Sequence, residues 1–264
     1  MVQGASGPLV TPDELAEAFA RSGLEGRVVL VHASLSRLGY VVGGAEAMLR
    51  ALLDAAGPGG TIMAPAQTWL NLDPSRGVHG VPPEEWPTLR AHLPGFDPAT
   101  TPSVGMGALA ESVRTWPGAA RSHHPVRSWA AVGVRATEIV AEHDLEDVHG
   151  ERSPLGSAYR ADARVALIGV GYDKCTALHL AETRSAHASK RWEAETSWVR
   201  EGTARYELRY RNQVFEDHDF ERIGAAFEAT GAVRIERIGN GELRTFDLRV
   251  LVDFASAWMG AQRQ

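Results

Sequence analysis

The chain has 264 residues, of which 44% are hydrophobic, and its 33 acidic and 27 basic side chains give a formal net charge of −6. This length allows a sizeable hydrophobic core, while the single cysteine, Cys175, excludes a disulfide framework and a multi-cysteine metal site. The sequence contains no basic block, which argues against nucleic acid as a partner, and the acidic balance suits a cationic small substrate.

No targeting or membrane segment is expected. The N-terminal stretch MVQGASGPLV has neither a basic region nor a long apolar core, so we predict no signal peptide. No apolar run reaches the length of about 18 residues that a membrane-spanning helix needs. Together with the low cysteine content, this predicts a cytoplasmic protein in a reducing compartment.

The first part of the chain reads as a helix followed by a strand–helix–strand unit. A capping-box pattern at Thr11 and Glu14 predicts a helix that runs to Leu24. Two continuous apolar runs, typical of strands buried on both faces, are joined by a loop and an amphipathic helix, which predicts a right-handed βαβ unit. These segments are the strand 27–32, the loop 34–44, the helix 45–56 and the strand 61–66.

A long connection follows. After it, the sequence predicts alternating helices and strands and, near the C-terminus, an antiparallel hairpin. Residues 67–102 are rich in proline and tryptophan, and we expect a functional loop because so long a connection rarely serves as a plain linker. Gly239, Asn240 and Gly241 mark a hairpin turn. The predicted helices are 106–115, 136–143, 153–159, 176–185, 217–230 and 251–259, and the predicted strands are 129–133, 165–170, 198–210 and the hairpin 233–249.

These elements predict an α/β fold, with a mostly parallel central sheet sandwiched by helices and an antiparallel C-terminal extension. Nothing in the sequence resembles a linker between independent units, so residues 1–264 are expected to form a single domain. In such folds, sites form at the carboxyl ends of the strands. The segments that leave the predicted strands are therefore where candidate residues are sought.

His179 and Glu182 are the first candidates. They lie three residues apart on the predicted helix that follows the strand at 165–170, and so share one helix face. A carboxylate one turn from an imidazole can orient it and make it a better base. A His–Glu pair on the helix surface is the alternative, and the spacing alone favours it, since HxxE by itself is a weak signal.

The loop from Ser34 to Gly44 is the second candidate. Its hydroxyls and glycines precede a helix, and such an arrangement can hold a pyrophosphate group. The loop matches neither a Walker A motif nor GxGxxG, which argues against a P-loop or dinucleotide site. The alternative is an ordinary glycine-rich connection, which the sequence pattern alone favours.

Metal and thiol chemistry are less favoured. His123 and His124 are adjacent, which makes their side chains point apart, and no carboxylate lies at a convincing ligand spacing, so no metal site is predicted. The remaining histidines considered as ligands are His143, His149 and His187. Cys175 precedes His179 by one helical turn, which is compatible with a Cys–His nucleophile, but a structural thiol at the helix entry is the favoured interpretation.

Seven segments together resemble the aminoglycoside 3-N-acetyltransferase family. They are VHASLSRLGYVVGG, GPGGTIMAPAQTW, NLDPSRGVHGVPPEEWP, FDPATTPSVGMGALAE, WPGAARSHHPVRSWAAVG, SPLGSAY and VALIGVGYDKCTALHLAE. They occur in the order and spacing of the family from about residue 29 to residue 184, and more weakly to the end of the chain. The resemblance implies the antibiotic N-acetyltransferase fold, which is distinct from the GNAT fold.

The resemblance also implies a reaction. Members transfer the acetyl group of acetyl-CoA directly to the 3-amino group of a 2-deoxystreptamine aminoglycoside, which gives antibiotic resistance. The histidine of the LHLAE motif is His179, the implied general base, and Glu182 would orient it or contact the cationic drug. Thr68 matches a position implied to stabilise the thioester oxyanion.

Binding residues are implied in the same way. Because an aminoglycoside is a polycationic sugar, its expected contacts are Trp69, Asp73, Asp97 and Glu182, although both aspartates precede proline and could instead start turns. The residues implied to contact acetyl-CoA are Ser34, Leu35, Ser36, Gly39, Val41, Val42, Ser103 and Gly105.

Two departures keep other functions open. Asparagine is common in the family where Cys175 stands, and the long NLDP…PEEWP segment occurs in members of narrow or unproven drug specificity. The alternatives are acetylation of a different amine, a non-catalytic protein that binds CoA or an aminoglycoside, and a metal-dependent hydrolase. The expected partners are small molecules, with no nucleic acid or membrane. Assembly into a homodimer is left as an open hypothesis.

Overall fold

The computed structural model describes residues 7–263, so part of the segment considered for a signal peptide lies outside the described residues. Among the described residues, no helix combines the length and apolarity that a bilayer crossing requires. The strands are β1 (Leu9–Val10), β2 (Val28–Ala33), β3 (Tyr40–Val41), β4 (Thr61–Pro65), β5 (Ala120–Arg121), β6 (Trp129–Gly133), β7 (Arg164–Ile168), β8 (Trp192–Glu201), β9 (Ala204–Gln213), β10 (Arg234–Ile238) and β11 (Gly241–Asp247). The α-helices are α1 (Pro12–Ala20), α2 (Gly44–Ala56), α3 (Trp86–His92), α4 (Ala108–Thr115), α5 (Ala136–Val140), α6 (Pro154–Arg160), α7 (Ala177–Arg184), α8 (Phe220–Glu228) and α9 (Leu248–Gln262).

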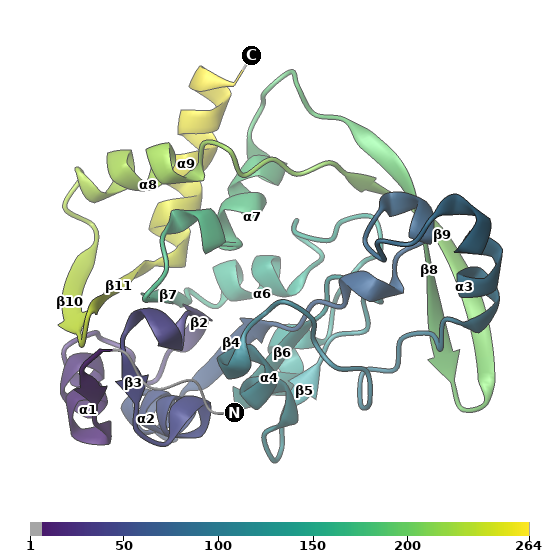
Figure 1. Ribbon diagram of the computed structural model, residues 1–264. Coiled ribbons are helices and arrows are strands. Elements are labelled where there is room, and N and C mark those ends of the chain that lie inside the picture. Colours follow the sequence, from purple (N-terminus) through teal and green to yellow (C-terminus); the bar gives the residue numbers. More distant parts are fainter. Residues whose placement is uncertain (1–6, 264) are drawn as a thin grey trace.

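A seven-stranded sheet with the order β10-β11-β7-β2-β4-β6-β5 forms the centre of the molecule (Figure 1). Strands β7, β2 and β4 pair in parallel, whereas β11 and β6 pair antiparallel to them on either side. The α/β fold and its antiparallel C-terminal extension are therefore confirmed. The sheet is more mixed than predicted, because β6 and β5 also add antiparallel pairings at the edge beyond β4.

Helices cover both faces of the sheet. Val29 and Val31 of β2 pack with α1, α2 and α4, while Leu30 of the same strand packs with the helices α5 to α9 on the opposite face. Because successive strand residues point to opposite faces, a strand buried on both sides has to be apolar throughout. This explains the continuous apolar runs that predicted the central strands.

The predicted helix starts and stops are largely confirmed. Thr11 and Glu14 form the capping box of α1, and Ser153 caps α6 by accepting a hydrogen bond from Gly156. The first helix ends at Ala20 rather than at Leu24. Its end is marked by the Ser22 hydroxyl, which donates to a carbonyl of the last turn, and by the glycine that follows it at φ +65.

The strand predicted at residues 198–210 is wrong as a single element. The chain instead forms the hairpin β8–β9, which pairs as a separate two-stranded sheet. Glu201 pairs with Ala204, and the two-residue turn between them contains Gly202 at φ +60, a conformation that favours glycine. Gly202 is the local signal that could have split the element.

The prediction that residues 67–102 form a loop is also incomplete. This segment contains α3 and three short 3-10 turns, and it lies along the β8–β9 hairpin (Figure 1). Leu72 and Phe96 form isolated bridges with the hairpin, and the Asn71 side-chain amide donates to the carbonyl of Trp198 at 2.7 Å. We call this segment and the hairpin together the hairpin lobe.

Candidate active site

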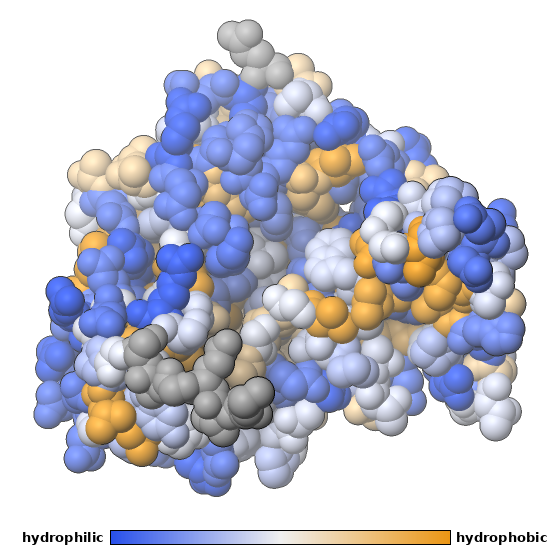
Figure 2. All heavy atoms as spheres, in the orientation of Figure 1, coloured by the Kyte–Doolittle hydropathy of each residue, from blue (hydrophilic) through white to orange (hydrophobic). Residues whose placement is uncertain are grey.

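Two adjoining pockets lie where the carboxyl ends of β2, β4 and β7 meet the hairpin lobe. The sheet-edge pocket has a volume of about 510 Å³, and the histidine pocket has a volume of about 340 Å³. Figure 2 shows a hollow between the part of the molecule that carries the sheet and the hairpin lobe. Residues that line both pockets are Gln67, Trp69, Thr176 and Asp217, so the two form one continuous cleft.

The sheet-edge pocket is built from chain segments that leave the parallel strands. Ser34 follows β2, Gln67 follows β4 and Val170 follows β7, and a glycine-containing segment before α4 completes the wall. Gly105 in this segment adopts φ +77, which a side chain would strain. The backbone there can therefore approach a ligand closely.

The histidine pocket contains the predicted His–Glu pair. His179 Nδ1 lies 3.0 Å from Glu182 Oε2, as expected for residues three apart on α7. The Glu182 side chain is 1% exposed, whereas the His179 side chain is 19% exposed and lines the pocket. Since Glu182 engages Nδ1, the other ring nitrogen of His179 is the one left for a ligand.

Aromatic rings hold the His179 imidazole in place. His149 stacks on it with ring centroids 5.1 Å apart and an interplanar angle of 14°, and Phe215 and Phe220 pack at 5.0 Å. Burial lowers the pKa of His149 well below its usual range, so this neighbour is neutral at physiological pH. His149 was considered from the sequence only as a metal ligand, and its place beside His179 was missed.

A second buried histidine links the two pockets. Burial and the nearby His179 lower the pKa of His32 to about 3, so its imidazole is neutral. Its Nε2 accepts a hydrogen bond from the Thr176 amide at 3.4 Å. This contact ties the start of α7 to the end of β2 and places Thr176 at the junction of the pockets.

Ion pairs line the far wall of the histidine pocket. Arg127 and Glu195 form a bidentate pair with N–O distances of 2.6 and 2.7 Å, and both side chains are buried. Burial opposes ionisation of Glu195, but Arg127 outweighs it and lowers the pKa of this carboxyl. Arg76 pairs with Glu193 at 2.6 Å, and the Arg127 guanidinium lies 4.9 Å above the Trp69 ring. Two carboxylates of this wall are thus already neutralised.

Comparison with known proteins places this cleft in context. Residues 30–260 match the family described as Aminoglycoside 3-N-acetyltransferase. The chain belongs to this family. It is 37% identical over 251 residues to the SPbeta prophage-derived aminoglycoside N(3')-acetyltransferase-like protein YokD of Bacillus subtilis, covering 94% of this chain and 92% of the relative. It is 33% identical over 272 residues to aminoglycoside N(3)-acetyltransferase IX of Micromonospora chalcea, covering 97% and 96%.

Solved structures of the family agree with the fold. The crystal structure of YokD from Bacillus subtilis superposes with a TM-score of 0.91 at 34% identity, covering 99% of this chain and 97% of the other. The structure described as AAC-IIIb binary with CoASH gives a TM-score of 0.84 at 30% identity, covering 97% and 98%. The predicted family is confirmed, and its named members are acyltransferases with a fold other than that of GNAT enzymes.

The residues that the family resemblance implied for the donor are only partly gathered in the sheet-edge pocket. Ser34 and Gly105 line it. The amide of Val42 donates to the Val10 carbonyl at 2.9 Å, within the pairing of β1 with β3. Ser103 donates to Glu111 from both its amide and its hydroxyl. The implied donor residues that do not line either pocket are Leu35, Ser36, Gly39, Val41, Val42 and Ser103.

Three other predicted residues have partners outside the cleft. The Thr68 hydroxyl accepts a hydrogen bond from Arg121 at 3.0 Å, and Thr68 lines neither pocket. Asp73 is held by Arg90, whose hydrogen bonds lower the pKa of this carboxyl, and it also accepts from the amide two residues later. Asp97 accepts from the backbone amide of residue 99 at 2.8 Å. Both aspartates therefore perform the turn chemistry that the sequence left as the alternative.

Cys175 has the environment of a structural thiol. It is 1% exposed, and burial raises the pKa of the thiol to about 12. A neutral thiol is a poor nucleophile. Among residues 7–263, no group of three or more histidine, cysteine, aspartate or glutamate side chains is arranged to hold a metal ion.

Two further histidines, the buried His124 and the half-buried His143, support the segment that carries Arg127. His124 Nδ1 accepts hydrogen bonds from the amides of Val126 and Arg127 at 3.1 and 3.0 Å. The His143 ring packs against that of His124 with centroids 4.8 Å apart and an interplanar angle of 41°, and it hydrogen-bonds the Ser122 hydroxyl at 2.8 Å. Burial lowers the pKa of His143 to about 3. These rings therefore stay neutral while the protein is folded.

We predict that His143→Gln flattens the pH dependence of stability. The folded protein keeps His143 unprotonated, whereas the unfolded chain takes up a proton below its ordinary pKa of 6.5. The unfolding free energy therefore falls as the pH drops from 6.5 towards the folded value of about 3. Urea unfolding at several pH values between about 6.5 and 5 should show a slope reduced by up to about 1.4 kcal/mol per pH unit in the variant.

The matched control for this measurement is His218→Gln, because the His218 side chain is 67% exposed. Its slope should equal that of the wild type. Equal slopes for the wild type and His143→Gln would contradict the interpretation of His143 as a histidine kept neutral by burial.

Cys175 should resist alkylation in the folded protein. Because its thiol is buried and neutral, iodoacetamide at about pH 8 should modify it at least roughly 100-fold more slowly than in urea-unfolded protein. Mass spectrometry of timed samples measures both rates, and Cys175→Ser should keep most of the wild-type acetyl transfer. An acetyl thioester recovered on Cys175 during turnover would contradict this interpretation.

Proposed function

We propose that this protein transfers the acetyl group of acetyl-CoA to the 3-amino group of a 2-deoxystreptamine aminoglycoside and so confers resistance to it. The observation that carries the proposal is the His179–Glu182 pair in a pocket that adjoins a second pocket at the sheet edge. A relative of the same fold is described with CoASH, and another is named as an aminoglycoside N(3)-acetyltransferase. A protein that only binds ligands has no need of an oriented base.

The sheet-edge pocket is the proposed donor site. Ser34 and the glycine segment around Gly105 would contact the pantetheine arm, and the thioester would lie near Thr176, where the two pockets meet. An acceptor in the histidine pocket then reaches the thioester without leaving the cleft. This arrangement supplies the proximity that transfer between two bound substrates requires.

His179 is the proposed general base. An amine near neutral pH is largely protonated, and its free form loses a proton as it attacks the thioester carbonyl. The ring nitrogen of His179 that does not bond Glu182 accepts this proton while the N–C bond forms. When the tetrahedral intermediate collapses, the C–S bond breaks, and the proton on His179 passes to the departing thiolate, which leaves as CoA thiol.

Thr176 is a better candidate than Thr68 for stabilising the oxyanion. Thr176 lines both pockets, whereas Thr68 lines neither and its hydroxyl accepts a hydrogen bond from Arg121. Direct transfer is favoured over an acetyl-enzyme because Cys175 is buried and neutral. Glu182 acts through His179 and not by touching the drug, since it is buried and both its oxygens have protein partners.

The histidine pocket, as the proposed acceptor site, suits a cationic sugar that carries few positive charges. Trp69 and Asp217 line the histidine pocket and provide an indole ring and a carboxylate for such a sugar. Two arginines and three carboxylates line the histidine pocket, so its lining carries one net negative charge. Because Glu193 and Glu195 are already paired, acetylation of an amine with fewer positive charges is the second candidate function.

A thiol-release assay with acetyl-CoA tests the proposal against a panel of aminoglycosides and simple amines. We expect turnover with at least one 2-deoxystreptamine drug and acetylation of its 3-amino group, assigned by NMR of the product. Turnover with simple amines alone would select the second candidate. Absence of thiol release with every amine would remove the enzymatic function.

His179→Ala should lower kcat by about 10²–10⁴-fold, because positioned acid–base catalysis contributes that much. Binding of acetyl-CoA, measured by calorimetry, should be unchanged, since His179 lines only the histidine pocket. His123→Ala is the control, because His123 is exposed and lines neither pocket. Wild-type turnover of His179→Ala on all accepted amines would show that this histidine is not the base.

Thr176→Val and Thr68→Val form a matched pair that separates the two oxyanion assignments. Each removes one hydroxyl and keeps the side-chain shape. Loss of an oxyanion donor costs about 10²–10³-fold in kcat, and we expect this loss for Thr176→Val only. The reverse result, with Thr68→Val as the slow variant, would return the role to Thr68.

A further inference from the structure

The C-terminal end of α9 supplies a buried cation beneath the His179–Glu182 pair. We propose that Arg263 is a positioning residue, which acts through Glu182 to set the orientation and proton affinity of His179. The inference deepens the proposed function and rests on it for its kinetic consequences. The site described above does not include Arg263, which lines neither pocket.

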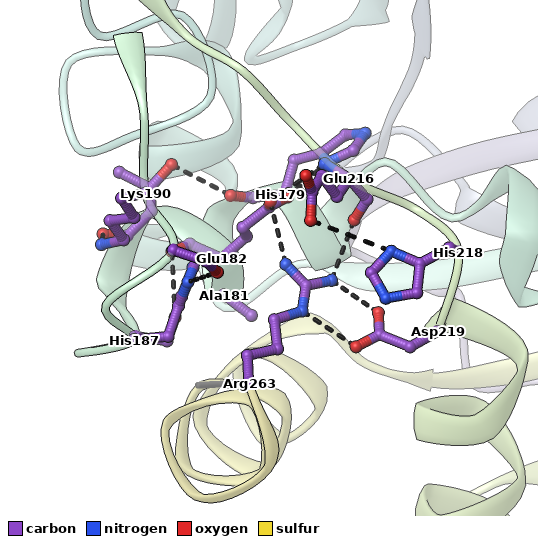
Figure 3. Close-up of polar contacts among 12 residues, drawn as sticks. His179, Ala181, Glu182, His187, Lys190, Glu216, His218, Asp219 and Arg263 are labelled. Atoms are coloured by element: carbon purple, nitrogen blue, oxygen red, sulfur yellow. Dashed lines mark hydrogen bonds and ion pairs between the residues drawn. The ribbon is translucent and has the colours of Figure 1, made fainter.

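Arg263 lies between two carboxylates (Figure 3). Its Nη1 atom is 2.9 Å from Glu182 Oε1, and its Nε and Nη2 atoms donate to both oxygens of Asp219 at 2.9 and 2.5 Å. Nη2 also donates to the carbonyl of Glu216 at 2.8 Å. The side chains of Arg263, Glu182 and Asp219 are 5%, 1% and 4% exposed, so water does little to screen these charges.

The two oxygens of Glu182 have different partners. Oε2 faces His179 Nδ1, and Oε1 accepts a hydrogen bond from the Glu216 amide at 3.0 Å and pairs with Arg263. An ionised carboxylate removed from water needs such compensation. Arg263 therefore keeps Glu182 charged and fixed, so that Oε2 can hold the Nδ1 proton of His179.

The charges of this cluster sum to a net negative charge. Glu182 and Asp219 contribute two negative charges and Arg263 contributes one positive charge, which leaves one negative charge while His179 is neutral. That charge is neutralised when His179 takes the proton of the attacking amine. The cluster thus favours proton transfer to His179, and the positive charge of Arg263 limits the strength of this effect.

The sign of each perturbation follows from this count. Removing the positive charge of Arg263 leaves the cluster with two net negative charges, so the His179–Glu182 pair holds its proton up to a higher pH. Removing the negative charge of Asp219 leaves a neutral cluster, so the pair releases its proton at a lower pH. Because the two groups are coupled, the measured midpoint belongs to the pair.

Other titratable and charged groups surround the pair and are unchanged in such a comparison. They are His32 and His149 beside the His179 ring, Asp217 in the pocket, and His187, Lys190, Glu216 and His218 around Glu182. Differences between the wild type and variants at Arg263 or Asp219 therefore isolate the buried cluster.

The test compares Arg263→Met, Arg263→Lys and Asp219→Asn with the wild type. We expect the rising limb of log kcat/KM against pH to move about one pH unit upwards in Arg263→Met and about one unit downwards in Asp219→Asn. Below the limb, kcat/KM of Arg263→Met should fall about tenfold and recover at higher pH. Arg263→Lys restores the charge and should return the limb to within about 0.3 unit of the wild type.

A second readout needs no turnover. The ring resonances of His179 can be followed by ¹H–¹⁵N NMR in the three variants and the wild type. Their titration midpoint should move upwards in Arg263→Met and downwards in Asp219→Asn, as the pH–rate limb does. The His179 ring of the wild type should carry its neutral-form proton on Nδ1. Acetyl-CoA affinity, measured by calorimetry, should be the same in all four proteins.

Each outcome decides the inference. A uniform loss of rate with an unmoved limb would mean that Arg263 only holds α9 in place, and the same displacement in Arg263→Met and Asp219→Asn would overturn the charge count. If Arg263→Met does not fold, the pH–rate limbs of the other two variants still test the inference. The limb should move downwards in Asp219→Asn and stay in place in Arg263→Lys. If the wild type acetylates no amine, the proposed function fails, whereas the NMR titration still tests the cluster.

Discussion

A carboxylate buried beneath the imidazole of His179 is the interaction around which the site is organised. Glu182 is almost fully shielded from water, so its charge has to be met by protein groups. Those groups come from two places remote from α7 in the sequence, the segment after β9 and the end of α9, and Asp219 at the start of α8 in turn holds the arginine. The last helix therefore supports the His179–Glu182 pair as well as covering the sheet.

Local signals were sufficient for much of the fold. The apolar runs of β2, β4 and β7, the caps at Thr11 and Ser153 and the glycine turn of the C-terminal hairpin each depend on residues close in sequence, and each is present. The same holds for His179 and Glu182, since one helical turn brings them together. The buried environment of Cys175 also agrees with its favoured structural interpretation.

Partnerships between distant residues were not accessible from the sequence. Asp73 was considered for a cationic drug, but Arg90 on a neighbouring helix occupies its carboxylate. Arg127 with Glu195, and Arg263 with Glu182, pair across the fold without any spacing that would reveal them. Thr68 and Ser103 illustrate the same limit, because a hydroxyl expected to meet a ligand is engaged by another side chain.

The hairpin lobe has a consequence for how proteins of this shape diversify. Strands β8 and β9 pair with each other in a sheet of their own, and the central sheet beside the sheet-edge pocket is hydrogen-bonded independently of them. Substitutions along the hairpin can therefore remodel one wall of the histidine pocket while the strands beside the sheet-edge pocket keep their register. Under the proposed assignment of the two pockets, the preference for the acceptor can then change between family members while the donor pocket and the buried His179–Glu182 pair stay the same.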